Sequence, residues 1–139
     1  MDIFPNVISR LILDFLEIDD QNYVINNWKS IVNVCDFSAK HGYLKLLKWA
    51  RSQGCKWDYR TCASAAENGH LQLLRWARSQ GCPWDVRTCL YAAKNNHLEL
   101  LKWARSQGCE WDKMTCFWAA RNGHSELLRW AKSQGCPCI

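Results

Sequence analysis

Apolar residues along residues 58–81 have the spacing of two short helices. In "CASAAENG" (62–69), the cysteine, the paired alanines and the glycine fall at i, i+3, i+4 and i+7, on one helical face. Asp58 lies just before this segment, where its carboxylate can cap the free amides of the first turn. The leucines and tryptophan of "HLQLLRWARSQ" predict a second amphipathic helix, which Gly81 ends in a left-handed conformation. Residues 61–87 therefore predict a unit of two helices.

This unit recurs with a period of 27 residues. The step is set by Cys35, Cys62, Cys89 and Cys116, and it divides the chain into units 34–60, 61–87, 88–114 and 115–139. The last unit is shorter, and Cys138 occupies the place that Trp holds in the others. A helix pair of this size cannot bury its own apolar face, and stacked neighbours supply the missing partner. We therefore predict an all-α solenoid, preceded by a separate helical segment over residues 1–33.

The repeated stretch "AAENGHLQLLRWARSQGCPWD" (65–85) resembles an ankyrin repeat, "AAxxGHLxxVxxLLxxGADVN", and the resemblance covers residues 34–139. The ankyrin period is 33 residues, however, and the family's "TPLH" is absent. The missing residues belong to the hairpin finger that joins ankyrin repeats. The resemblance thus implies an ankyrin-like array without β-hairpin fingers, and a non-enzymatic protein that binds other proteins.

Residues 4–16, "FPNVISRLILDFL", resemble the opening of an F-box, "LPxEvxxxILxfL", and "NNWKSI" (26–31) resembles its closing helix. The matching residues are Phe4, Pro5, Ile12, Leu13, Leu16 and Trp28. The resemblance implies docking to the adaptor subunit of a cullin-type ubiquitin ligase, with the repeats holding the substrate. F-box and ankyrin combinations resemble those of large DNA viruses, which implies a host-directed role. The alternative is a helical cap that covers the first repeat.

The composition suits one intracellular domain. Of 139 residues, 48% are apolar, with nine Trp and nine Cys. No apolar run reaches the ~18–20 residues of a membrane span, and the N-terminus lacks the features of a signal peptide. We therefore expect a location in the cytoplasm or nucleus, in the host cell if the protein is viral, with reduced thiols and no membrane partner.

The many cysteines could bind a metal, act in redox chemistry or pack the core. Structural zinc sites have two Cys only two to four residues apart, whereas six residues separate Cys55 from Cys62. His70 should lie at the far end of the helix from Cys62. We therefore expect small buried side chains and no metal or cofactor, with a redox role and a disulfide of the Cys55–Cys62 type as alternatives. The tryptophans are expected in the core, and the repeated histidines are expected to stabilise turns.

Positions that vary between units indicate where a partner could bind. The first helices of the third and fourth units carry bulky residues on the side opposite the Cys/Ala face, which in ankyrin arrays is concave. We call these six residues the helix-one stripe: Leu90, Tyr91, Lys94, Phe117, Trp118 and Arg121. The alternative is that they fill gaps between layers. Because the C-terminal repeat lacks a polar cap, we expect a monomer or a weak homodimer through that repeat.

A rival interpretation is binding of nucleic acid or another polyanion. The second helices carry a repeated set of cations, here called the basic ladder: Lys48, Arg51, Arg75, Arg78, Lys102, Arg105, Arg129 and Lys132. Such a row can contact phosphates. Its strict repetition and its expected place on the convex face favour a role in solubility instead. The sequence also contains no glycine-rich phosphate loop and no distinctive nucleophile–His–carboxylate set, so we expect no enzyme activity.

Overall fold

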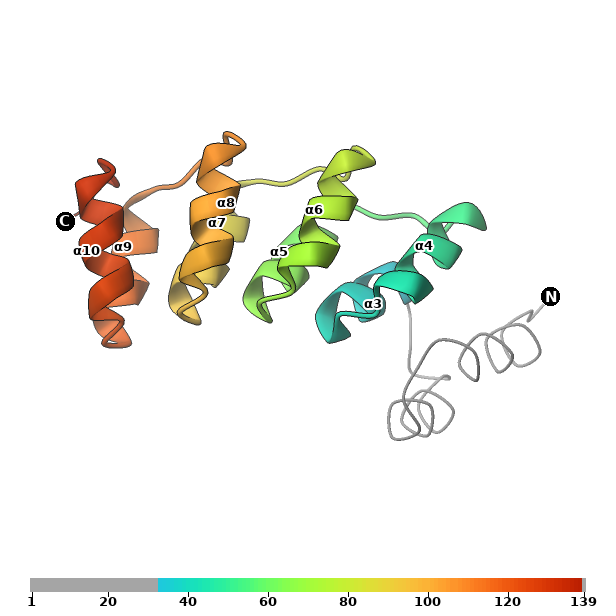
Figure 1. Ribbon diagram of the computed structural model, residues 1–139, viewed down its shortest axis with the longest axis horizontal. Helices are drawn as coiled ribbons and strands as arrows, with labels where there is room; N and C mark the ends of the chain where they lie inside the picture. Colours follow the sequence, from blue (N-terminus) through green and yellow to red (C-terminus); the bar gives the residue numbers. More distant parts are fainter. Residues whose placement is uncertain (1–32, 139) are drawn as a thin grey trace.

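The computed structural model describes residues 33–138, where the helices form a stacked array (Figure 1). The F-box-like segment lies outside the described residues. The first helices of the four units are α3 (Val34–His41), α5 (Tyr59–Glu67), α7 (Val86–Lys94) and α9 (Lys113–Arg121). The second helices are α4 (Leu44–Ser52), α6 (Leu71–Ser79), α8 (Leu98–Ser106) and α10 (Ser125–Ser133). The predicted all-α solenoid is confirmed, and residues 33–138 contain no strand.

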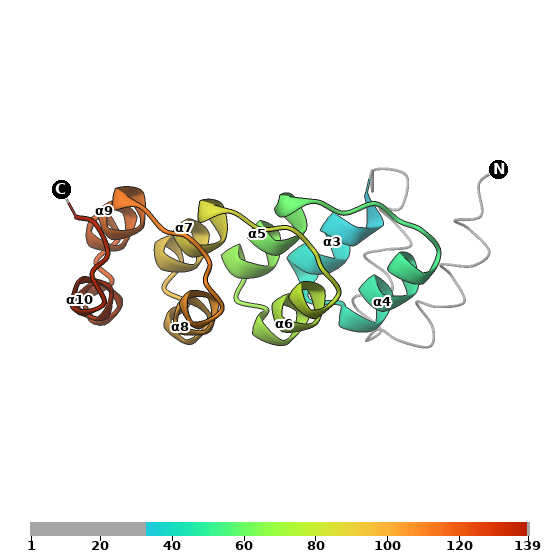
Figure 2. The same ribbon diagram turned by 90° about the horizontal axis from the view of Figure 1, so that it is seen from above.

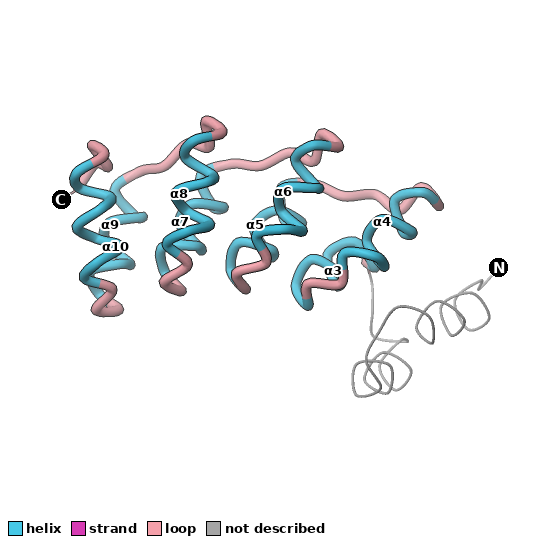
Figure 3. Tube along the Cα trace, viewed as in Figure 1, coloured by secondary structure: helices cyan, strands magenta, loops and turns pink. Residues whose placement is uncertain are grey.

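The helices form two layers that run the length of the array (Figure 2). In the first layer α3, α5, α7 and α9 pack directly on their neighbours, whereas the helices of the second layer pack mainly on their own partners. The helices of the first layer consequently lie closer to their neighbours than those of the second layer (Figure 2). Short loops connect the helices at both ends (Figure 3). Within residues 33–138, no helix is long and apolar enough to cross a membrane.

Side-chain caps and left-handed residues set the helix ends. The Asp58, Asp85 and Asp112 carboxylates each accept a hydrogen bond from the backbone amide two residues further on, which confirms the predicted capping role of Asp58. After α6 the chain turns through Gly81, whose φ of 84° suits glycine. The predicted boundaries are correct to within about two residues.

Small side chains form the contact between neighbouring units. Cys62, Ala65 and Ala66 on α5 are fully buried, as are their counterparts on α7, and Leu74 on α6 is equally buried beneath them. Small residues allow the first helices to approach closely, and the leucines fill the space between the two layers. The prediction that the cysteines on this face are buried packing residues is confirmed.

The repeated histidines make hydrogen bonds at turns, as the sequence predicted, and each of these bonds also joins two neighbouring units. The Nε2 atom of His97 lies 3.0 Å from the carbonyl oxygen of Glu67, in the preceding unit, and His70 binds Lys40 in the same way. A Cβ at Gly69 would lie 2.7 Å from the His97 ring. Glycine at this position therefore allows both the positive φ of the turn and the close approach of the imidazole.

Candidate protein-interaction surface

The helix-one stripe lies along α7 and α9, in the layer of first helices. Phe117 is 39% exposed and is the one large apolar side chain classed as exposed within residues 33–138. Arg121 is also exposed, whereas Leu90, Tyr91, Lys94 and Trp118 are half-buried. Apart from Leu90, these residues contribute to two hollows and to an aromatic cluster around Trp118.

The first hollow lies over α3, α5 and α7 and has a volume of about 410 Å³. The Arg87 guanidinium lies 4.3 Å from the centre of the Tyr59 ring, and Tyr91 completes the aromatic part of the wall. Arg60 forms a 2.8 Å ion pair with Asp58 and thereby holds the pKa of that carboxyl below its ordinary value. The remaining lining residues are Asp36, Ala63, Ser64 and Glu67. The hollow is thus of mixed polarity, with charges of both signs around two tyrosines.

The aromatic cluster lies on α9, beside this hollow. The rings of Phe117 and Trp118 are 5.4 Å apart at an interplanar angle of 85°, and the Lys94 ammonium lies 4.5 Å from the centre of the Trp118 ring. A cation over an indole face is attracted by the ring quadrupole. Lys94 and Trp118 therefore hold each other in place, while the Phe117 ring remains available to a partner.

Leu90 differs from the other members of the stripe. The 27-residue register places Leu90 where Asp36 stands in the first unit, and Asp36 accepts a 2.8 Å hydrogen bond from the Thr61 hydroxyl. Thr115, the counterpart of Thr61 in this pair of units, is fully buried and its hydroxyl has no hydrogen bond. Leu90 is half-buried and stands in the register of the Asp36 carboxylate, which in the first unit bonds to the next unit. It lines neither hollow.

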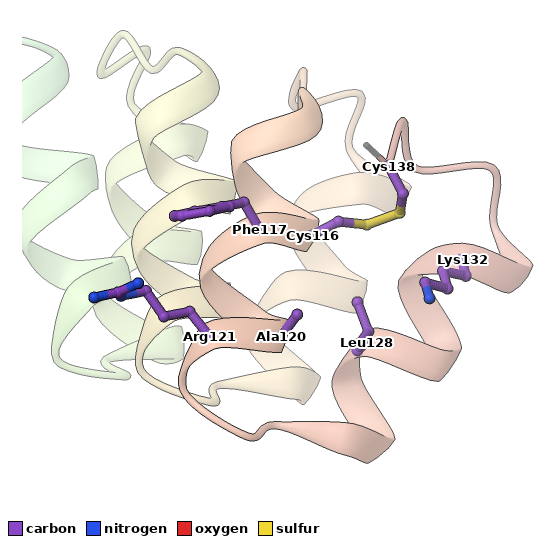
Figure 4. A pocket seen from close by; sticks show the side chains of 7 residues that line it. All are labelled: Cys116, Phe117, Ala120, Arg121, Leu128, Lys132 and Cys138. Atoms are coloured by element: carbon purple, nitrogen blue, oxygen red, sulfur yellow. A yellow bond between two sulfur atoms is a disulfide. The ribbon is translucent and has the colours of Figure 1, made fainter.

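The second hollow is at the C-terminal end of the array, where no further unit follows α9 and α10 among the described residues. We call it the open-end pocket: it measures about 420 Å³ and is lined by Cys116, Phe117, Ala120, Arg121, Leu128, Lys132 and Cys138 (Figure 4). Ala93 and Leu101, the counterparts of Ala120 and Leu128, are fully buried by the next unit. Ala120 is exposed and Leu128 half-buried because nothing packs on them in the structure.

Three of the eight residues of the basic ladder contact the linker after their own helix, so the solubility interpretation does not account for these three. The Arg78 guanidinium lies 4.1 Å from the centre of the Trp84 ring and donates a 2.6 Å hydrogen bond to the Cys82 carbonyl. Arg51 and Arg105 make the same two contacts in their own units. Each arginine thereby ties its helix to the linker that leads into the next unit. Arg75 lies 6.0 Å from the Trp103 ring and is exposed.

The tryptophans form edge-to-face pairs at the border of the core. Trp84 and Trp103 are 5.9 Å apart at 64°, and the pairs Trp57–Trp76 and Trp111–Trp130 repeat this geometry. All six indoles are partly buried and pack against the core, as expected from the sequence. An edge-to-face pair with a stacked arginine contributes more to the stability of the linker than burial of its apolar area alone would.

The cysteines are arranged in pairs within each unit, so the Cys55–Cys62 pairing considered from the sequence does not occur. Hydrogen bonding to Cys55, together with burial, raises the pKa of Cys35, and the same hydrogen bond lowers the pKa of Cys55 to about 6. Hydrogen bonding between Cys89 and Cys109 likewise raises the pKa of Cys89 and lowers that of Cys109. Within residues 33–138, no group of three or more His, Cys, Asp or Glu side chains is placed to hold a metal ion.

The expectation of uniformly reduced thiols is not met at the C-terminal end. Cys116 and Cys138 are joined in a disulfide, and the other seven cysteines are free. Sequence reasoning missed this pair, although the replacement of a repeated Trp by Cys138 was a visible signal. It also left Tyr59 and Arg87 out of the predicted binding residues, because the contact between their units depends on tertiary packing.

Comparisons with known proteins suggest no function for this surface, so its geometry is the basis for interpretation. A scan against protein-family models finds no match, and a search of curated proteins finds no related sequence.

Proposed function

We propose that the chain is a non-enzymatic protein-interaction module that binds its partner on the face formed by the first helices. The observation that carries this proposal is the exposed Phe117 ring, which lies beside Trp118 and Lys94. Aromatic side chains are enriched in protein interfaces, and Trp, Tyr and Arg dominate the binding energy there. The adjacent hollow with Tyr59 and Tyr91 extends the same face toward the N-terminal units.

The rigid frame around these residues also supports a binding role. The first helices are fastened to one another by fully buried alanines and cysteines, and the histidines bond neighbouring units. A partner that binds across α5, α7 and α9 would therefore meet a surface whose shape is already formed. Preorganisation of this kind reduces the entropy lost on binding.

The test uses a photo-crosslinking amino acid placed at Phe117 in the full chain, with Gln72 on the opposite layer as the matched control position. A protein that crosslinks at 117 and not at 72 is purified and its affinity for the unlabelled chain is measured. Tyr91→Ala and Trp118→Ala should each weaken binding by about 2 kcal/mol, as truncation of an interface hot spot does. Thermal unfolding should change little in either variant. Loss of folding stability of several kcal/mol in both would instead identify these rings as packing between units.

A further inference from the structure

The last unit departs from the repeat at one exposed position. Trp57, Trp84 and Trp111 each stand one residue before an N-cap aspartate, and the next residue in this register is Cys138. In the earlier units an arginine stacks on that indole. In the last unit Lys132 takes the place of the arginine, and Lys132 and Cys138 line the open-end pocket together (Figure 4). A cysteine thus stands at the edge of a pocket, at the position where each earlier unit has a tryptophan.

Cys116 is the residue that can pair with this cysteine. It is 3% exposed, and its Cα lies 5.6 Å from that of Cys138, a separation that suits a disulfide. The counterparts of Cys116 in the other units are paired only with the thiol twenty residues further along, and all of those thiols are free. Cys116 has the buried Cys136 and the exposed Cys138 as neighbours, and it is joined to Cys138 in a disulfide.

We propose that Cys138 and Cys116 form a thiol–disulfide exchange site that reacts with anionic low-molecular-weight disulfides, of the class to which glutathione disulfide belongs. In the reduced chain, the Cys138 thiolate attacks one sulfur of the small disulfide. Its S–S bond breaks, one small thiolate leaves, and a mixed disulfide forms on Cys138. The Cys116 thiolate then attacks the Cys138 sulfur and releases the second small thiolate.

The reaction balances without another reactant. Two protein thiols are oxidised to the Cys116–Cys138 disulfide, and one small disulfide is reduced to two small thiols, which take up the two protons that the cysteines lose. Excess small thiol reverses both steps. The site therefore reports the ratio of small thiol to small disulfide around the protein.

Exposure and charge favour Cys138 as the first residue to react. Lys132 lines the same pocket, and a cation there favours the thiolate and attracts an anionic disulfide. Burial raises the pKa of Cys136, so this thiol remains protonated and unreactive. Cys55 is the strongest rival because its pKa is about 6, but its sulfur is partly buried and is held by the Cys35 thiol.

The experiment exposes the reduced full chain to glutathione disulfide, quenches samples over time and maps every cysteine by alkylation and mass spectrometry. A glutathione adduct should appear first on Cys138 and then give way to the Cys116–Cys138 disulfide, with the other seven thiols still free. In Cys116→Ser the adduct on Cys138 should persist. In Cys138→Ser the reaction should slow by at least about tenfold, whereas Cys55→Ser should react like the wild type.

Two further variants separate chemistry from folding. Cys138→Trp restores the repeat at an exposed position, so it should fold normally and take up no glutathione. Lys132→Glu should slow the reaction with glutathione disulfide and accelerate that with cystamine, a cationic disulfide. The proposed site would be contradicted if the first adduct formed on Cys55. It would also be contradicted if the Cys138 thiol stayed free at equilibrium with excess glutathione disulfide. Equal rates of Lys132→Glu and the wild type with both disulfides would overturn its preference for anions.

Discussion

Replacing Arg78 by alanine should destabilise the fold far more than replacing Arg75, although both substitutions remove one positive charge from the basic ladder. Arg78 donates a 2.6 Å hydrogen bond to the Cys82 carbonyl and lies 4.1 Å from the centre of the Trp84 ring. Both contacts join α6 to the linker before α7. Arg75 is exposed, and its guanidinium is 6.0 Å from the Trp103 ring.

The expected magnitudes follow from these contacts. A hydrogen bond from a charged group contributes about 1.5–3 kcal/mol, and a partly exposed cation–π contact contributes about 0.5–1 kcal/mol. Because one half-buried side chain makes both contacts, we expect Arg78→Ala to lower the free energy of unfolding by about 2 kcal/mol. Arg75→Ala should cost about 0.5 kcal/mol or less. Arg78→Lys keeps the charge but loses the planar guanidinium, so most of the loss should remain.

Urea unfolding followed by far-UV circular dichroism measures these differences, and binding to a DNA duplex at near-physiological salt is measured for the same variants. Equal losses of stability in Arg75→Ala and Arg78→Ala, with Arg78→Lys like the wild type, would refute the reasoning from geometry. If both alanine variants instead keep the wild-type stability and lose DNA affinity equally, the ladder acts through its charge. The polyanion interpretation of the sequence would then be favoured.

Two more predictions concern the open end and the thiol pairs. Leu101→Ala should lower the free energy of unfolding by about 2–5 kcal/mol because Leu101 is fully buried. Leu128→Ala, at the half-buried counterpart, should lower it markedly less. Equal losses in chemical denaturation would mean that the end of the array is covered. The alkylation rate of Cys55, followed by peptide mapping, should rise with pH through a midpoint of about 6, because the thiolate forms above that pKa. Cys35→Ala should move this midpoint up toward 9.0. An unchanged midpoint would mean that the hydrogen bond from Cys35 does not lower the pKa of Cys55.

Much of the fold could be predicted from local patterns. The period of the cysteines, alanines and leucines indicated helix pairs, and Asp58 and Gly81 marked where helices begin and end. These signals are local because capping and left-handed turns depend on residues within one helical turn. The stacking of the units also followed, since a single helix pair has no other way to bury its apolar face.

The sequence predicted the exposed members of the candidate site less completely. Phe117 and Arg121 are exposed, but Leu90 is half-buried and lines neither hollow, and the partners of Trp118 and Tyr59 come from neighbouring helices. Spacing along the chain places a residue on a helix face but does not say which residue of the next helix meets it.

The sequence by itself determined the repeat, the helix pairs and the burial of the small face, because period and capping are properties of a single unit. Only the tertiary structure decided what crosses from one unit to the next. It brought Lys94 onto Trp118, Arg87 onto Tyr59, and His97 onto the Glu67 carbonyl. The physical reason is that such contacts depend on the rotation and spacing between stacked units. Side-chain packing over the whole interface sets that geometry, and no residue pattern within one unit records it.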